Sequence, residues 1–406
     1  MKLAVFLLAS AAAFAQDFAQ RGTLEFRGYG FPDTATNDSS RAIGETLFRY
    51  EFSKSLSIPN LKFFGETEMR VDTHRQTERR VFVNFADRIS QRPAISVRRA
   101  SLLYNKGRLT VEAGKQFIRW GKADILNPTD RFAPKDFLAV VDTELLAVLA
   151  GRAIYEGKSD SVEIVVQPRF TPARLPLRNQ RWTVTPPDLE QIRLTERKPA
   201  FPGGSAFGAR WNHVASGYEA SLSFYNGHHY LPLLDGRIIS EPFGIQLERI
   251  YPQLRLYGAD IAVPLKWFTL KGEAAWFKSG TALADEYILW VVQAERQFGE
   301  ASIVAGYAGE EVTKARNPLS FAPDRGLAKS FLGRAAYTID PRRSVSTEFA
   351  IRQNGAGVWT KFEYTQTFGQ HLRALAGFTI IRGDTDDFLG QYRRNSHAFL
   401  ILRYSF

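Results

Sequence analysis

The sequence predicts an all-β protein: a closed antiparallel β-barrel of about 18 strands that crosses a membrane. Two patterns predict this fold. Segments of about ten residues alternate apolar and polar positions along the chain, as transmembrane strands do. The connections between them alternate between short turns and long polar loops, as in barrels whose two ends face different compartments.

The alternation begins near the N-terminus, where Leu24 and Phe26 alternate with Glu25 and Arg27. The same two-residue period returns around residues 48–52, 61–70, 109–113, 162–167, 218–224, 268–276 and 398–404. Because backbone groups in lipid must be paired within the sheet, we expect the first and last strands to meet and close a barrel. The charged faces then line the interior and the apolar faces meet lipid.

Short connections carry the Gly, Pro, Asn and Asp that are typical of turns. They lie near residues 58–60, 105–107, 156–158, 215–217, 263–265, 297–299, 340–342 and 368–370. Following short and long connections in turn gives about 18 strands, with about 16 as the alternative. The alternative stays open because alternation is poor at 147–155, 205–212 and 331–339. One barrel domain is expected to fill residues 16–406.

The first 15 residues are typical of a secretory signal peptide. Lys2 precedes an apolar run, and Ala13-Phe14-Ala15 fits a cleavage site before Gln16. The chain has no cysteine, which excludes disulfides and cysteine-ligated metals. Its net charge of +11 is scattered along the chain, whereas nucleic-acid binding proteins more often concentrate such charge.

With this leader, the alternating strands and the terminal Tyr404-Ser405-Phe406, the chain resembles Gram-negative outer-membrane β-barrels of the porin type. The resemblance implies a place in the bacterial outer membrane and contact with its lipid and lipopolysaccharide. It also implies that the barrel assembly machinery recognises the C-terminal strand, which ends at Phe406. A homotrimer is left open, and no nucleic-acid partner is expected.

The segment "GKQFIRWGKADILNPTDRFAPKDF", residues 114–137, is predicted to carry selectivity. It leaves the fifth expected strand and enters the third long loop, which in general porins folds into the barrel and narrows it. The segment lacks the acidic loop motif of those porins, but it resembles a "WG…NP.D…P.D" segment of uncharacterised porin-like families. Mixed charges in a constriction would orient passing ions. The candidate residues are Arg119, Trp120, Lys122, Asp124, Asn127, Asp130, Arg131, Lys135 and Asp136.

Other interpretations of these residues stay open. The Asn127-Pro128-Thr129-Asp130 stretch is also an ordinary turn that could only anchor the loop. A calcium site of Asp124, Asn127, Asp130 and Asp136 is a further alternative, although the spacing matches no known calcium loop. The Arg- and Pro-rich loop at 168–204 is expected to stay solvated, with lipopolysaccharide phosphates or passing anions as alternative partners. The pore-lining candidates on the strands are Glu66, Glu68, Arg70, Arg99, Lys361 and Glu363.

These observations predict a channel for passive diffusion of small polar or charged solutes, with an anion preference suggested by the net charge. A channel for hydrophobic compounds is the first alternative, because Phe399 and Ile401 are expected to point inward. The second is a barrel enzyme acting on lipid. None of the six histidines lies in a motif with a serine and a carboxylate, so we expect no catalytic residue, cofactor or metal.

Overall fold

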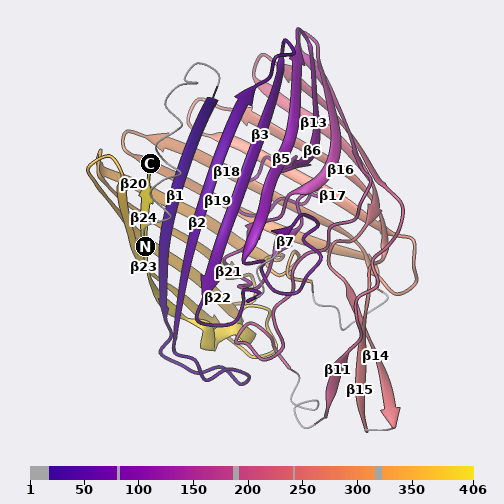
Figure 1. Ribbon diagram of the computed structural model, residues 1–406, viewed down its shortest axis with the longest axis vertical. Helices are drawn as coiled ribbons and strands as arrows, with labels where there is room; N and C mark the ends of the chain where they lie inside the picture. Colours follow the sequence, from indigo (N-terminus) through magenta and orange to yellow (C-terminus); the bar gives the residue numbers. More distant parts are fainter. Residues whose placement is uncertain (1–17, 80–82, 186–191, 241–242, 316–321) are drawn as a thin grey trace.

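The computed structural model describes residues 18–79, 83–185, 192–240, 243–315 and 322–406, and its main sheet is a closed antiparallel barrel of 18 strands (Figure 1). The strands are β1 (Phe18–Gly30), β2 (Ala42–Ser55), β3 (Leu61–Asp72), β5 (Ile95–Lys106), β6 (Leu109–Gln116), β9 (Val148–Glu156), β10 (Asp160–Gln167), β12 (Ala206–Ala215), β13 (Tyr218–His228), β16 (Gln253–Pro264), β17 (Thr269–Ser279), β18 (Glu286–Phe298), β19 (Ala301–Lys314), β20 (Ser330–Asp340), β21 (Arg343–Arg352), β22 (Gly357–Phe368), β23 (Leu372–Gly383) and β24 (His397–Ser405). The predicted strand number is therefore confirmed.

The barrel closes where β1 pairs with β24, from Thr23 opposite Ser405 to Gly30 opposite Ala398. Backbone bonds between Gly22 and Phe406 extend this seam, with the Gly22 N–H 2.9 Å from the Phe406 carbonyl. On the inner side of the seam, Arg403 donates to Glu25. The terminal strand therefore has both of its edges covered, as the sequence predicted.

The two-residue alternation separates the faces of the barrel. On β24, Leu400 and Leu402 point outward and are 50% and 39% exposed, while Phe399 points inward and is buried. On β1, Phe26 is exposed on the outside and Glu25 is buried on the inside. On these two strands the outer face is thus apolar, so that lipid can cover it, and Glu25 and Arg403 place charge on the inner face.

Several short elements accompany the barrel. The two-residue strand β4 (Val83–Asn84) runs parallel to β5, and β7 (Lys135–Asp136) pairs with β8 (Glu144–Leu145). A separate sheet is formed by β11 (Leu194–Glu196), β15 (Phe243–Ile250) and β14 (Leu233–Ser240), and β14 and β15 project beyond the barrel end in Figure 1. A 3-10 helix, η2 (Gly390–Asn395), precedes β24. The predicted signal peptide lies outside the described residues, and no described helix is long and apolar enough to cross a membrane.

Gly114 in β6 is a position that requires glycine. Its φ is +127°, and a Cβ there would lie 2.3 Å from the Ala100 carbonyl oxygen. We expect Gly114→Ala to destabilise the barrel by at least about 1–3 kcal/mol, because the strained backbone adds to the clash. The measurement is the urea concentration at which half of the protein loses the heat-modifiable gel migration of the folded barrel. Gly151→Ala in neighbouring β9 is the control, since a Cβ there meets no described atom within 4 Å; equal midpoints would contradict the prediction.

Candidate functional site

The candidate site is the loop between β6 and β9, residues 117–147, which we call the inward loop. It contacts inward-facing side chains on several parts of the wall, including Arg27 on β1, Glu273 on β17 and Lys361 on β22. A segment that reaches such distant strands from the inside must cross the lumen. The inward loop follows the fifth barrel strand and is the third long loop, at the position predicted from the sequence.

The first half of the inward loop is folded onto itself by Asp130. Its Oδ1 accepts hydrogen bonds from the backbone N–H groups of Trp120, at 2.6 Å, and Gly121, at 2.8 Å. Gly121 fits because a Cβ would lie 2.6 Å from the Cβ of Asn127. Asn127 in turn donates to the carbonyl of Ala123. In this part of the site the Trp-Gly and Asn-Pro-Thr-Asp motifs therefore shape the loop.

Glu273 on β17 fastens this folded segment to the wall. One carboxylate oxygen accepts the N–H groups of Lys122 and Ala123, at 3.0 and 3.1 Å. The other accepts the N–H and the hydroxyl of Thr129, both at 2.8 Å. Four donors on one buried carboxylate make Glu273 the main anchor of the inward loop.

Further anchors lie on either side of Glu273. The indole N–H of Trp120 donates to Glu163 on β10 at 2.9 Å. The Lys122 ammonium lies 2.9 Å from Asp260 on β16, and Lys271 on β17 lies 3.2 Å from Asp124. These charged candidates are thus paired with the wall.

Arg131 is buried in an aromatic site. Its guanidinium lies 4.8 Å from the ring centres of both Tyr230 and Phe277, and its Nη1 is 3.4 Å from Asp324 in the loop before β20. In contrast, the side chain of Arg119 is 53% exposed and only one long contact, at 3.4 Å, joins it to Asp130. Burial lowers the pKa of Lys135, and the charge of the Asp130 carboxylate opposes this shift. Among the cationic candidates of the loop, Arg119 is the one that water reaches most readily.

Asp136 joins the inward loop to two other loops. Its Oδ2 lies 2.9 Å from Nε of Arg92 and 2.6 Å from Nη1 of Arg174. Burial alone raises the pKa of Asp136, but the two guanidiniums outweigh it and hold this pKa at about 2. Arg174 belongs to the Arg-rich loop that was expected to stay solvated. That expectation is wrong for Arg174 and Arg181, which are both buried. Arg174 donates to the Asp136 carboxylate, and Arg181 donates to the Ser40 carbonyl in the β1–β2 loop.

The predicted pore-lining residues all lie on the inner face, and most are paired. Glu66 lies 2.7 Å from Arg98, Glu68 lies 2.7 Å from Arg49, and Arg70 lies 2.7 Å from Glu45. Arg99 lies 2.6 Å from Glu112, Lys361 lies 3.4 Å from Asp142, and Glu363 accepts a bond from Thr365. The inner face of β1, β2, β3 and β5 therefore carries a network of ion pairs between guanidiniums and carboxylates.

The sequence interpretation did not include Glu144, Glu273, Arg27 or Arg98 among the site residues. Arg27 and Glu273 could have been found, since each stands on the polar side of an alternating strand. Arg98 was hidden by a bulge in the pairing of β3 with β5, which shifts the register between Glu66 and Thr67. Glu144 follows no periodic pattern, so no sequence signal marked it.

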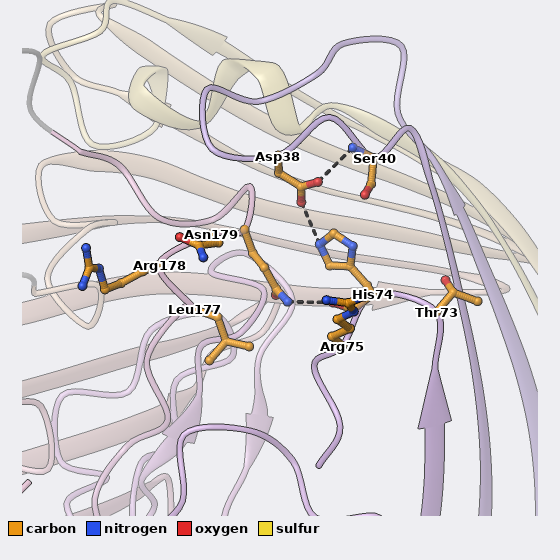
Figure 2. Close-up of a pocket in the computed structure, with 9 residues that line it drawn as sticks. Asp38, Ser40, Thr73, His74, Arg75, Leu177, Arg178 and Asn179 are labelled. Atoms are coloured by element: carbon orange, nitrogen blue, oxygen red, sulfur yellow. Dashed lines mark hydrogen bonds and ion pairs between the residues drawn. The ribbon is translucent and has the colours of Figure 1, made fainter. Parts of the chain in front are cut away.

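A pocket of about 430 Å³ lies where the β1–β2, β3–β5 and β10–β12 loops meet (Figure 2). Figure 2 shows the imidazole of His74 facing Asp38, and the atoms Nε2 and Oδ2 are 2.7 Å apart. Gln180 donates to the carbonyl of His74 at 2.7 Å. These contacts tie the three loops together at the end of the barrel where the inward loop begins.

The alternative calcium site receives no support from this geometry. Asp124, Asp130 and Asp136 each bind different partners: Lys271, the backbone at Trp120, and Arg92 with Arg174. Within the described ranges, no three His, Cys, Asp or Glu side chains gather where they could hold a metal ion.

A closed 18-strand barrel with a loop folded into its lumen is a barrel of the porin type. Solved structures with this fold include a BenF-like porin from Pseudomonas fluorescens Pf-5, at 10% identity and a TM-score of 0.57 over 96% of this chain and 98% of that one. Acinetobacter baumannii OccAB4 is similar at 10% identity and a TM-score of 0.55, over 96% and 99% of the two chains. Pseudomonas aeruginosa OccK11 (OpdR) is similar at 10% identity and 0.52, over 96% and 97%. The sequence matches no protein-family model and no curated protein.

Proposed function

We propose that this protein is an outer-membrane channel through which small polar or charged solutes diffuse passively. The observation that carries the proposal is the inward loop, anchored by Glu273 and Asp136 inside a barrel whose inner face is charged. Such a loop narrows a water-filled path, and its charges act on what passes. The similarity in fold to porins supports the same function.

The outer face supports a place in the bacterial outer membrane. Aromatic side chains gather near the closing seam, where the rings of Phe48 and Phe406 stack with centres 6.3 Å apart and Tyr404 lies 6.2 Å from Phe406. Aromatic girdles of this kind mark membrane interfaces in such barrels. Contacts with lipopolysaccharide, recognition of the terminal strand by the barrel assembly machinery, and a homotrimer remain predictions.

The hydrophobic-compound alternative is less well supported than the polar channel. It rested on the inward Phe399 and Ile401, but the Lys361 ammonium lies 5.3 Å from the centre of the Phe399 ring. Phe399 is also buried, so it offers little apolar surface to a solute. A non-catalytic role is part of our proposal.

The proposal is tested by single-channel recording of the purified protein in a planar bilayer under a salt gradient. We expect discrete conductance steps from protein whose folding is shown by heat-modifiable gel migration. Folded protein that never conducts would refute the channel. Uptake of a hydrophobic probe by liposomes that carry the protein, without ion conductance, would favour the alternative.

The anion preference is best tested at Arg119, because this cation is exposed in the inward loop. We expect Arg119→Ala to shift the reversal potential toward cation selectivity, since the inward loop then has one positive charge fewer to attract passing anions. The matched control is Arg237→Ala in β14, an exposed arginine of the separate outer sheet. A reversal potential equal to that of the unmodified protein would remove Arg119 from the filter.

A further inference from the structure

The separate sheet outside the barrel has an open edge. Within this sheet β15 lies in the middle, and β14 pairs with it from Leu233 opposite Ile250 to Ser240 opposite Phe243. In the part of the chain that the structure describes, no strand pairs with the other edge of β14. The backbone N–H and carbonyl groups that point to this edge can therefore bind another strand.

Large apolar side chains lie beside the open edge. Ile238 on β14 is 78% exposed, and Leu234 is 37% exposed. Because Ser240 lies opposite Phe243, every second residue of β14 shares one face of the sheet with Phe243 of β15. Phe243 is 69% exposed on that face. An open edge next to an exposed apolar face indicates a surface that binds another chain.

The charges of β14 are complementary to a second copy of the same strand. Residues 233–239 read "LLDGRII", with an acid and a base on either side of Gly236. When two copies run antiparallel with Gly236 opposite Gly236, Asp235 of each copy lies opposite Arg237 of the other. A register centred on Asp235 or on Arg237 would instead place like charges opposite each other, which destabilises a sheet.

The apolar residues of β14 favour the same register. With Gly236 at the centre, Leu234 of each copy lies opposite Ile238 of the other, and Leu233 lies opposite Ile239. Apolar pairs directly across two strands stabilise a sheet. The two charged side chains are also available for such pairs, because Asp235 and Arg237 are 47% and 69% exposed and lie 3.8 Å apart within one copy.

We propose that β14 binds β14 of a second copy of this chain, antiparallel and centred on Gly236, so that two three-stranded sheets become one continuous sheet. The contact is isologous, since the same residues serve on both sides. Because β14 and β15 project beyond the barrel end (Figure 1), an antiparallel partner approaches from the opposite direction. The two barrels then lie in facing membranes. This contact between membranes is a function separate from the passage of solutes.

The test is clustering of liposomes that carry the full-length protein, measured by dynamic light scattering. We expect the unmodified protein to cluster them, since many weak contacts between two vesicles act together. Asp235→Arg and Arg237→Asp each place like charges opposite each other, so each should need at least about tenfold more protein for clustering. Lys158→Glu is the control, since Lys158 is exposed in the β9–β10 turn and this substitution changes the net charge as Arg237→Asp does.

Two further samples separate strand pairing from general charge effects. In the Gly236-centred register, the cations of Asp235→Arg lie opposite the anions of Arg237→Asp. Vesicles that carry one variant should therefore cluster with vesicles that carry the other when the two are mixed with different dyes. The variant with both substitutions has the net charge of the unmodified protein and reversed ion pairs, so it should cluster by itself.

The proposal is overturned if vesicles with the unmodified protein stay dispersed, which would leave the edge of β14 to a different protein. It is also overturned if either single variant clusters like the unmodified protein, or if the mixed vesicles stay apart. Heat-modifiable gel migration shows that each variant is folded. Single-channel recordings in one bilayer contain no facing copy, so the channel and its controls in β14 are tested independently. Clustering without conductance would contradict only the channel.

Discussion

Replacing Glu273 by alanine is expected to give a channel with a larger and noisier single-channel conductance. The substitution removes the acceptor for four hydrogen bonds, from Lys122, Ala123 and Thr129. At roughly 1 kcal/mol for each bond, the folded position of the inward loop loses about 3–5 kcal/mol. The loop then spends time away from the wall, so the narrow part of the lumen opens and fluctuates.

The matched control for this variant is Glu363→Ala. Glu363 also faces the lumen, but it accepts its bond from Thr365 on its own strand rather than from the inward loop. The control leaves the anchors of the inward loop intact, so its conductance noise should equal that of the unmodified protein. A Glu273→Ala channel of unchanged conductance and noise, with normal heat-modifiable migration, would show that Glu273 does not hold the constriction.

Acid should loosen the same loop through Asp136. The pKa of this carboxyl is about 2, below the ordinary 3.8, so its ionised form stabilises the folded loop. This contribution, about 2 kcal/mol, is complete above about pH 4 and is lost as the pH falls from about 4 to about 2. We expect conductance noise to rise over that interval. Asp136→Asn should show the same noise at neutral pH, because an amide pairs poorly with Arg92 and Arg174.

The control for the acid experiment is Asp235→Asn in β14, whose carboxylate lies on the outer sheet 3.8 Å from Arg237. It should leave the acid response unchanged. If Asp136→Asn is as quiet at neutral pH as the unmodified protein, the Asp136 pairs do not hold the inward loop.

The barrel could be predicted from the sequence because a membrane leaves the strands few choices. Lipid outside and charge inside force the two-residue period. The sequence therefore predicts β1 from Leu24 and Phe26 alternating with Glu25 and Arg27, and β24 from the alternation over residues 398–404. Even the strands with poor alternation were placed by the order of turns and loops. The bulge beside Arg98 is the exception, since a local extra residue leaves no mark in the pattern.

The inward loop was located by the sequence, but the roles of its residues were not. Thr129 bonds to Glu273, which lies 144 residues further along the chain, and Arg131 lies beside Asp324. Such partners are decided by the curvature of the closed barrel, which no local pattern records. For the same reason Glu144 could not be predicted, since its ion-pair partners Arg27, Arg70 and Arg98 lie on strands that precede it in the chain.

The pairing of β1 with β24 also constrains the order of events during folding. Glu25 and Arg403 are separated by 378 residues, and Gly22 bonds to Phe406 at the very end of the chain. Closing a contact over so long a stretch is slow. The ring can form only after synthesis has delivered the last strand, so a nascent chain waits with two open edges that invite wrong pairing. The inward loop, whose anchors are spread over the ring, then settles as a late step of maturation.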